Sequence, residues 1–573
     1  MKYKRNLIWL ILVIAVLMSA GCKKNDEKKT EAETEEIQET KESKAVKESK
    51  VKKEKQEKNS KKPHILLNKM NENAYDSYEG EYLYNLRSIK ISLKEEEGFD
   101  SLRKAIEEYN EKMEEKYAGM KEDMDFFGKQ EIENRKDGFN SSILKDIVNT
   151  YIMRSDESIV SILNYEEYNY TGAKTMYSRE SCNFDTRTGK ILSFLDVVKD
   201  DESFFEIVDD LAKKDYPESN IKDPSEYAKE LRENDYKDLV WTVSPEGVTV
   251  YFDTGTLGSF TDGPQVITVC FDEDDALFES KYVNKEKDYV FPILADNMTL
   301  HLDTDGDGER ESVYVQNIYD QDEESLDIYS TGVEVFAGDE SMKYEGSDGE
   351  TYIVKKSGKY YMYIFILTTE YMTDLRRLDL SNLQKNDDDF YFVTLGTKDY
   401  DWQAKDNVEK YTVLHETLTD TKSFIGEEIG YVLSTAASER EWYVDDDAIP
   451  RHKEDRAKVT TSHVLHTLKD VACSEVDENG QEKKAATIPE DSYVLFIYTD
   501  NESYVDVRVI DEDDVEAHDW GEGESYFTLT DKSLMDYDGN CYRITLDNVG
   551  EEMMSTIDGV DITELFEGIL FAG

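Results

Sequence analysis

The sequence predicts an α+β domain followed by mainly-β domains, preceded by a signal peptide and a disordered charged tether. Three observations predict this order in a chain of 573 residues. Residues 1–21 run from basic through apolar to small side chains, and residues 22–62 hold almost no apolar groups. From Pro63 onward, most segments alternate apolar and polar residues as strands do, and only a few space them as helices do.

The first 22 residues have the order of a secretory signal. Met1–Arg5 is basic, Leu7–Met18 is purely apolar, and small residues lead to Cys22. The apolar run is shorter than the roughly 20 residues of a spanning helix. The segment resembles the lipobox of bacterial lipoproteins, whose cysteine takes a diacylglycerol and becomes the new N-terminus. We therefore expect a signal peptide at 1–21, a lipid at Cys22 and a place on the outer face of the cell membrane, of Gram-positive type. An ordinary cleaved signal and an uncleaved anchor are the alternatives.

The segment after Cys22 has the composition of a tether. Residues 23–62 contain fourteen lysines and eleven acidic residues. Such a stretch buries too little apolar surface to offset the entropy of ordering it. We expect residues 22–62 to act as a solvated spacer between the membrane and the rest of the chain.

The charge of the chain limits its partners. The formal net charge is −60, and residues 63–573 hold 117 acidic against 51 basic residues. Nucleic acid is excluded as a partner because a phosphate backbone requires a basic surface. A cationic protein, a cationic peptide or a divalent metal is favoured instead. The alternative is that the acidity serves solubility alone.

The length after the tether is too great for a single hydrophobic core. We place folded regions at 63–287, 288–460 and 461–573. Four cysteines remain beside Cys22, namely Cys182, Cys270, Cys473 and Cys541. None forms a CxxC pair, so the spacing excludes a zinc ribbon and a thioredoxin-type site. Free thiols and disulfides both remain open.

The first region, 63–287, mixes helices and strands. Apolar spacing predicts a helix over 97–117 with Asp100 as its N-cap, and further helices at 201–214 and 224–234. Alternation predicts strands at 83–94, 157–170 and 265–271, and a hairpin over 239–252 about Pro245-Glu246-Gly247.

Five segments of this region, taken in order, are similar to a known family. They are LRKAIEEYN (102–110), DESIVSIL (156–163), NFDTRTGKILSFLDVVKD (183–200), WTVSPEGVTVYFD (241–253) and GPQVITVCF (263–271). Together they resemble the extracytoplasmic domain shared by the anti-sigma factor RsiV and the peptidoglycan deacetylase PdaC. The resemblance implies an α+β domain, which in RsiV-like proteins binds lysozyme and gates release of a sigma factor.

Neither effector of that family is expected here. Met1–Arg5 is too short to hold a sigma factor. PdaC-like enzymes carry a separate metal-dependent deacetylase domain, and the chain has no paired-histidine metal motif and no TFDD-like run. The sequence therefore predicts the binding module without an effector.

The second region, 288–460, contains an acidic loop with the spacing of a calcium ligand set. Asp303, Asp305, Asp307 and Glu311 occupy positions 1, 3, 5 and 9 of such a loop, and glycines between them permit tight turning. Position 12 is Tyr314 rather than Glu, so the loop is not an EF-hand. We predict Ca²⁺ here in a structural role. The alternative is a polar hairpin turn, which Asp and Gly also favour.

The pattern of the remaining sequence predicts mainly strands. Alternation predicts them at 327–336, 351–369, 389–396 and within 463–510, and apolar spacing predicts a short terminal helix over 560–571. His463 and His466 are three residues apart in a strand-like run without a nearby thiol. We predict surface histidines rather than a metal pair.

The motifs predict a binding protein and not an enzyme. The chain has no HExxH, GxSxG, P-loop or dinucleotide glycine fingerprint. We expect a membrane-anchored lipoprotein that binds lysozyme, another cationic protein or a cell-wall component such as peptidoglycan. The alternatives are a cell-wall hydrolase with unmarked carboxylate catalysts and a passive structural envelope lipoprotein.

Overall fold

The computed structural model describes residues 62–571, except 77–79, 81, 95–97, 138–142, 171–174, 297, 322–327, 369–372, 386–389, 392, 406, 522–523 and 548–554. The signal peptide, Cys22 and nearly all of the tether lie outside the described residues. Lys61–Gly573 form one compact unit. Within the described part, no helix is long and apolar enough to cross a membrane.

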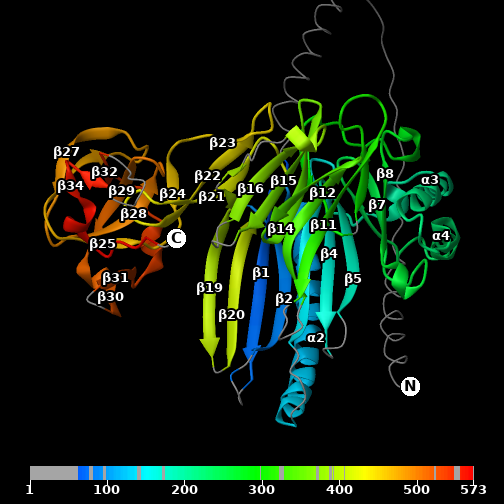
Figure 1. Ribbon diagram of the computed structural model, residues 1–573, viewed down its shortest axis with the longest axis horizontal. Helices are drawn as coiled ribbons and strands as arrows, with labels where there is room; N and C mark the ends of the chain where they lie inside the picture. The colour runs from blue at the N-terminus through cyan, green and yellow to red at the C-terminus, as the bar shows by residue number, and fades with distance from the viewer. Residues whose placement is uncertain are drawn as a thin grey trace, which may run out of the picture. The chain divides into compact units, whose positions relative to one another are not determined.

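The predicted α+β class followed by β structure is confirmed. A seven-stranded sheet, called sheet A, has the order β19-β20-β1-β2-β3-β4-β5 (Figure 1). Its strands are β1 (Ile65–Tyr75), β2 (Tyr82–Leu93), β3 (Leu144–Ser155), β4 (Ile159–Asn169), β5 (Met176–Asp185), β19 (Thr397–Lys405) and β20 (Val408–Glu416). β1 pairs with β20 in antiparallel register from Leu66 opposite Glu416 to Ala74 opposite Val408. Sheet A is therefore completed by residues more than 300 positions away along the chain.

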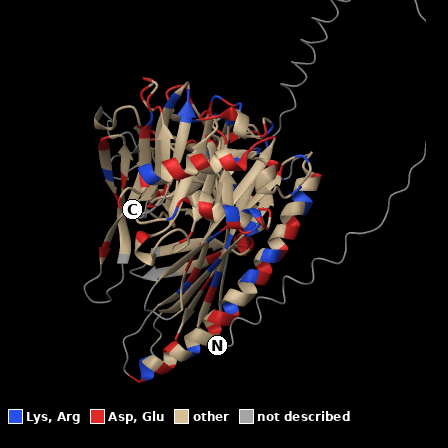
Figure 2. Cartoon of the chain, turned by 90° about the vertical axis from the view of Figure 1, so that its right-hand side faces the viewer, with Lys and Arg blue, Asp and Glu red and all other residues tan. Residues whose placement is uncertain are grey.

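The long helix α2 (Asp100–Lys136) packs on sheet A and extends well past the predicted end at 117. Acidic and basic residues are interspersed along it, which suits a helix with one solvated face (Figure 2). The prediction that Asp100 caps this helix is wrong. Phe99 holds the N-cap position without a side-chain hydrogen bond, and Asp100 lies in the first turn. There its carboxylate complements the positive end of the helix dipole.

The start of α2 takes the place of a strand beside β2. β2 and β3 pair in parallel only from Tyr84 to Arg87. Farther along β2, the Asn110 amide donates to the Ile91 carbonyl at 2.7 Å and accepts from the Ile91 N–H at 2.9 Å. The side chain thus satisfies backbone groups that the sheet leaves open.

A second seven-stranded sheet, called sheet C, has the order β13-β12-β11-β10-β8-β7-β6. Its strands are β6 (Val240–Val243), β7 (Gly247–Phe252), β8 (Gln265–Cys270), β10 (Thr299–Leu302), β11 (Glu311–Gln321), β12 (Ile328–Ala337) and β13 (Glu340–Glu345). The predicted hairpin is confirmed as β6 and β7.

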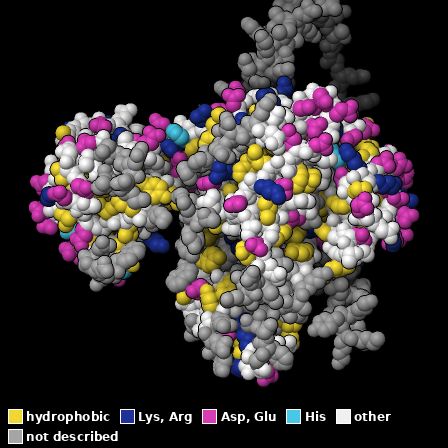
Figure 3. Space-filling model, viewed as in Figure 1, with side chains coloured by type: hydrophobic (Ala, Val, Ile, Leu, Met, Phe, Trp, Pro, Cys, Tyr) yellow, Lys and Arg dark blue, Asp and Glu magenta, His cyan; other side chains and the backbone are white. Residues whose placement is uncertain are grey.

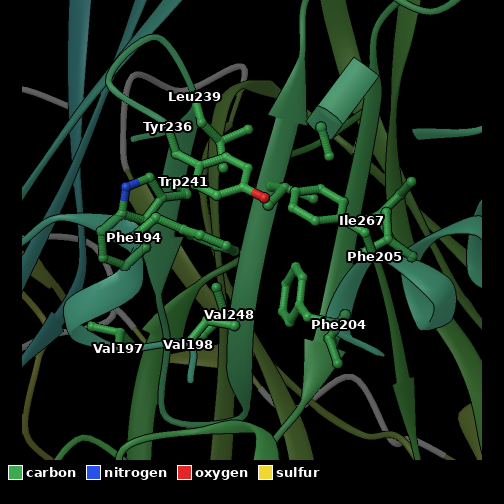
Figure 4. Packing of buried hydrophobic residues seen from close by; sticks show 14 of the residues in the cluster. Phe194, Val197, Val198, Phe204, Phe205, Tyr236, Leu239, Trp241, Val248 and Ile267 are labelled. Atoms are coloured by element: carbon green, nitrogen blue, oxygen red, sulfur yellow. The ribbon is translucent and has the colours of Figure 1, made fainter. Parts of the chain in front are cut away.

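Two helices close the core beside β6–β8. They are α3 (Asp201–Asp215) and α4 (Pro224–Arg232), which confirm the predicted helices. Asp200 caps α3 by accepting from the Ser203 N–H. The core is aromatic: Phe205 stacks on Tyr236 with ring centroids 5.9 Å apart, and Phe194 meets Trp241 edge to face (Figure 4). Aromatic pairs of this kind add about 1 kcal/mol each beyond the area they bury.

A five-stranded sheet, called sheet D, has the order β17-β16-β15-β14-β9. Its strands are β9 (Tyr289–Pro292), β14 (Ser347–Lys356), β15 (Lys359–Leu367), β16 (Thr373–Asp379) and β17 (Phe390–Tyr391). The prediction of a buried strand near 359–369 is confirmed, since Tyr360–Ile366 are all buried in β15.

The last sheet, called sheet E, holds fourteen strands. They are β18 (Thr394–Leu395), β21 (Phe424–Gly430), β22 (Ala436–Val444), β23 (Pro450–His452), β24 (Ala457–Val459), β25 (Val464–Thr467), β26 (Val471–Val476), β27 (Glu482–Ile488), β28 (Tyr493–Thr499), β29 (Tyr504–Ile510), β30 (Val515–Gly521), β31 (Glu524–Leu529), β32 (Cys541–Thr545) and β35 (Phe566–Glu567). β33 (Thr556–Ile557) and β34 (Val560–Asp561) form a separate pair.

The predicted terminal helix over 560–571 is wrong. Val560–Asp561 is a strand, Ile562–Glu564 is a single 3₁₀ turn, and Phe566–Glu567 pairs with β25. Gly568 has φ of 91°, which a right-handed helix cannot accommodate. The apolar spacing of this segment reflects burial from several strands rather than one helical face.

The prediction of two surface histidines is wrong for His463. Its side chain is buried and lies edge to face with Phe496, with ring centroids 5.0 Å apart. His466, in β25, is half-buried and stacks on Tyr493 at 4.8 Å. Both positions face aromatic partners on strands that are distant in sequence, so local alternation did not reveal them.

Candidate functional site

The acidic loop joins β10 to β11 at the edge of their hairpin. Leu302 lies opposite Glu311, so residues 303–310 close the connection. Gly306 and Gly308 have φ of 81° and 95°, a left-handed conformation that residues with a Cβ rarely adopt. These two glycines let the backbone turn sharply between the aspartates.

Each aspartate of the loop also fixes the backbone that follows it. Asp303 Oδ1 accepts from the Gly306 N–H at 2.8 Å, and Asp305 Oδ1 accepts from the Asp307 N–H at 3.0 Å. Asp307 Oδ1 accepts from the Glu309 N–H at 2.8 Å. These local bonds are typical of Asp-rich turns. In all three aspartates the oxygen that accepts the backbone hydrogen bond is Oδ1.

Three of the four predicted ligands lie together. Ligand oxygens of Asp303, Asp305 and Glu311 lie within 4.8 Å of one another. Because Ca²⁺ binds oxygen at 2.3–2.6 Å, two ligands of one ion lie at most about 5 Å apart. Asp307 lies outside this group. The carboxylates of the group can therefore reach one hard cation, with Asp305 exposed and the other two half-buried.

Hydrogen bonds close the base of the loop. Glu311 Oε2 accepts from the Thr304 N–H at 2.8 Å and from its hydroxyl at 2.6 Å. His301 in β10 is buried and lies 2.9 Å from Asp215 of α3. Its partner is 86 residues away, and sequence reasoning missed this contact because no local pattern marks it.

A buried carboxylate at the β6–β7 turn is a second feature that sequence reasoning missed. Glu246, predicted only as a turn residue, is 8% exposed. Its Oε1 accepts from the Tyr289 hydroxyl and, at 2.7 Å, from the Tyr360 hydroxyl, and Lys355 Nζ lies 3.9 Å away. Burial beside this carboxylate raises the pKa of both tyrosines well above the ordinary value, so they remain protonated donors. The cluster ties the hairpin to sheet D.

The four described cysteines are free thiols. Burial raises the pKa of Cys182 and of Cys270 to about 12. A thiol reacts as its thiolate, so these two side chains are packing groups rather than nucleophiles.

The C-terminal region has the highest ratio of acidic to basic residues of the three regions. Residues 461–573 contain twenty-eight acidic and six basic residues. Figure 3 shows acidic side chains outnumbering basic ones on the visible face of this part. Asp511, Glu512 and Asp513 form an exposed run between β29 and β30. Within the described part of the chain, none of these three has a cation within 4 Å; we call them the acidic turn.

No family model matches the chain, and no curated protein matches it. Among the solved structures that are similar to it are two DUF3298 family proteins. One, from Bacteroides fragilis, is 13% identical with a TM-score of 0.29. The other, from Pseudomonas aeruginosa, is 14% identical with a TM-score of 0.26. Each alignment covers 38% of this chain and 94% of the solved chain.

Proposed function

We propose that the protein is an extracytoplasmic lipoprotein, held to the membrane through Cys22, that binds a cationic protein on its acidic surface. Lysozyme is the first candidate partner, as the RsiV/PdaC-like segments of residues 63–287 imply. Support for the location comes from the order of basic, apolar and small residues before Cys22. Support for the partner comes from charge.

The observation that carries this proposal is the acidic turn. Its three carboxylates are adjacent in sequence, exposed, and without a cation within 4 Å in the described part of the chain. Like charges held this close repel one another, and a cationic surface relieves that repulsion. By contrast, Asp506 on neighbouring β29 is fully buried and already neutralised by Arg456 and Arg543 at 3.0 and 2.7 Å.

The first test is a titration of lysozyme into the fragment Pro63–Gly573 at two salt concentrations. We expect binding at about 20 mM salt that weakens steeply at 0.5 M, because the Debye length shrinks below about 5 Å over this range. Isothermal titration calorimetry measures the affinity at each salt concentration. Absence of heat at low salt rules out lysozyme as the partner.

A matched pair of triple variants locates the binding surface. The first neutralises the acidic turn as Asp511→Asn, Glu512→Gln and Asp513→Asn. The second removes the same charge from exposed α2 positions as Glu107→Gln, Glu111→Gln and Glu115→Gln. We expect about tenfold weaker binding in the first variant, since exposed pairs contribute about 0.2–1 kcal/mol each. Equal losses in both variants indicate overall charge and not a local surface.

We also propose that Asp303, Asp305 and Glu311 hold a structural Ca²⁺. Support comes from their mutual approach within 4.8 Å and from the two glycines that shape the loop. Added Ca²⁺ then raises the melting temperature by mass action. Asp303→Asn abolishes that rise, whereas Asp307→Asn leaves most of it. Equal melting curves with Ca²⁺ and with chelator contradict the site.

The competing functions give different results with the same fragment. Soluble muropeptides released from peptidoglycan indicate a hydrolase with carboxylate catalysts. If the fragment binds neither lysozyme nor peptidoglycan, the remaining hypothesis is a passive structural lipoprotein. Metabolic labelling with a fatty acid tests the anchor, and Cys22→Ser removes the label if the lipid is attached there.

A further inference from the structure

A pocket of about 400 Å³ lies beside the buried carboxylate of Glu246. Four segments line it: the β6–β7 turn, the residues that follow β8, the segment that leads into β9, and the β14–β15 turn. Its volume falls within the range of roughly 300–1,000 Å³ that is usual for small-molecule sites. Pro245, Phe271 and Tyr289 give part of its wall an apolar character. The pocket is thus large enough for a small organic ligand.

Three of the carboxylates that line the pocket already have cationic partners. The pairs are Asp272 with Arg310 at 2.5 Å, Glu286 with Lys62 at 2.6 Å, and Asp288 with Lys356 at 3.1 Å. These pairs neutralise the three carboxylates from outside the pocket lining. Lys287 also lines the pocket, and its side chain is exposed to solvent. Glu246 and Lys355 are the charged groups of the wall that remain.

Glu246 and Lys355 lie side by side with hydrogen-bonding capacity left over. The distance from Glu246 Oε1 to Lys355 Nζ is 3.9 Å, longer than a hydrogen bond. Glu246 Oε1 accepts from two tyrosine hydroxyls, whereas Oε2 accepts no hydrogen bond from the described residues. The Lys355 ammonium has three N–H donors, donates to the Tyr360 hydroxyl, and lies over the rings of Tyr289 and Tyr360. A carboxylate oxygen of a residue that is 8% exposed is therefore available to a ligand in the pocket.

These two neighbouring charges select the charge pattern of a ligand. A cation placed beside the Glu246 carboxylate also lies near the Lys355 ammonium, and an anion placed beside that ammonium also lies near the carboxylate. Either arrangement sets like charges side by side, which is costly away from bulk water. A ligand with adjacent ammonium and carboxylate groups places each of them beside the opposite charge. The four charges then alternate in sign, and both side chains gain charge-assisted hydrogen bonds.

We propose that this pocket binds a free α-amino acid with an apolar side chain. Its ammonium group donates to Glu246 Oε2, its carboxylate accepts from Lys355 Nζ, and its side chain packs against the apolar wall at Pro245 and Phe271. A single carbon carries both charged groups of an α-amino acid, so they can face two protein groups 3.9 Å apart. Peptides lack this pairing, because each peptide terminus carries only one of the two charges. The site shares no residue with the acidic turn and does not rest on the proposed cationic-protein surface.

The first test is calorimetric titration of the full-length chain in detergent at pH 7 with leucine, leucinamide and N-acetylleucine. Leucinamide keeps only the ammonium group, as a peptide N-terminus does, and N-acetylleucine keeps only the carboxylate, as a peptide C-terminus does. We expect leucine to bind at least tenfold more tightly than either derivative. Equal affinity for one of the derivatives overturns the assignment to a free amino acid. No heat from leucine at 10 mM overturns the site as a whole.

Two variants that each remove one charge link the binding to the two side chains. Glu246→Gln removes the partner of the ammonium group, so leucine should lose its advantage over N-acetylleucine. Lys355→Gln removes the partner of the carboxylate, so leucine should lose its advantage over leucinamide. Residues that only shape the pocket would weaken the binding of all three ligands alike, and that result overturns the proposal. Far-ultraviolet circular dichroism shows that each variant is folded.

The matched controls change lining residues whose charge is already paired or lies in solvent. Asp272→Asn, at a side chain that is 75% exposed and paired with Arg310, should leave the leucine affinity within a few fold. Lys287→Gln, at an exposed position, should do the same. Losses as large as those of Glu246→Gln and Lys355→Gln would assign the effect to the overall charge of the pocket and overturn the proposal. The three ligands on the unaltered chain decide the question if either variant fails to fold.

Discussion

Residues 63–287 and 461–573 carry the same excess of twenty-two acidic residues but use their charge differently. The first has fifty acidic and twenty-eight basic residues, and the second has twenty-eight and six. In the first, buried ion pairs such as Asp76–Arg135 at 2.7 Å connect the helix to the sheet. In the second, the acidic turn has no such partner. Equal net charge can therefore serve internal structure in one region and an outer surface in another.

The largest expected effect comes from breaking the Asp76–Arg135 pair. Arg135→Leu removes a guanidinium that is 4% exposed and leaves Asp76, 1% exposed, without that cation. Loss of one partner from a buried pair costs about 3–5 kcal/mol. Urea denaturation of the fragment Pro63–Gly573 measures this loss. A loss below about 1 kcal/mol would contradict the view that this region uses its charge internally.

Asp506, a fully buried carboxylate of the C-terminal region, allows a sharper comparison. Asp506→Asn keeps the shape of the side chain but removes the charge between Arg456 and Arg543. We expect a loss of about 2–3 kcal/mol, the scale of hydrogen bonds to charged groups. The nearby acidic turn should show no comparable loss when Asp513→Asn is measured in the same way.

A pH-dependent prediction concerns Asp146 in β3. This side chain is fully buried; burial raises its pKa to about 7, Tyr170 opposes the rise by donating to it, and Glu166 adds to it. The folded chain therefore keeps a proton that the unfolded chain releases between about pH 4 and pH 7. Stability contributed by this group falls as pH rises through that window.

Asp146→Asn should remove this slope. At pH 8 the variant should be more stable than the natural chain by on the order of 1–3 kcal/mol, and near pH 4 the gain should vanish. Urea midpoints between pH 4 and pH 8 measure the difference. Glu115→Gln, an exposed change on α2, is the control and should leave the slope unchanged. A parallel shift at every pH would contradict the assignment.

The smallest effect is expected in the acidic turn. Neutralising Asp511, Glu512 and Asp513 should raise stability by a few tenths of a kcal/mol at low salt, because it removes like-charge repulsion. The gain should disappear at 1 M salt, where the Debye length is about 3 Å. Thermal unfolding at the two salt concentrations measures it. Destabilisation at low salt would show that these carboxylates have structural partners.

The sequence predicted local elements better than it predicted their neighbours. Apolar spacing located α3 and α4, alternation located β2 and β4, and the turn residues located the β6–β7 hairpin. The same reasoning failed over 560–571, where strands from several partners bury the residues that spacing assigned to a helix. It also failed at His463, which packs on Phe496.

In the candidate metal loop, too, the sequence located the residues but not their spatial arrangement. Asp and Gly spacing pointed to the loop, and the structure brings Asp303, Asp305 and Glu311 together but leaves Asp307 outside. Spacing identifies which residues share a loop. Which of their oxygens converge depends on the backbone turns at Gly306 and Gly308.

The sequence by itself determined the α+β class, the charge excess, and the patterns that mark local helices and strands, because these depend on neighbours within a few residues. Tertiary structure decided the rest. It added β20 to β1, placed Asn110 against the edge of β2, and gathered Lys69, Asn149 and His415 around one cavity. Those contacts join residues far apart along the chain, and no local periodicity encodes which distant segment completes a sheet or faces a cavity.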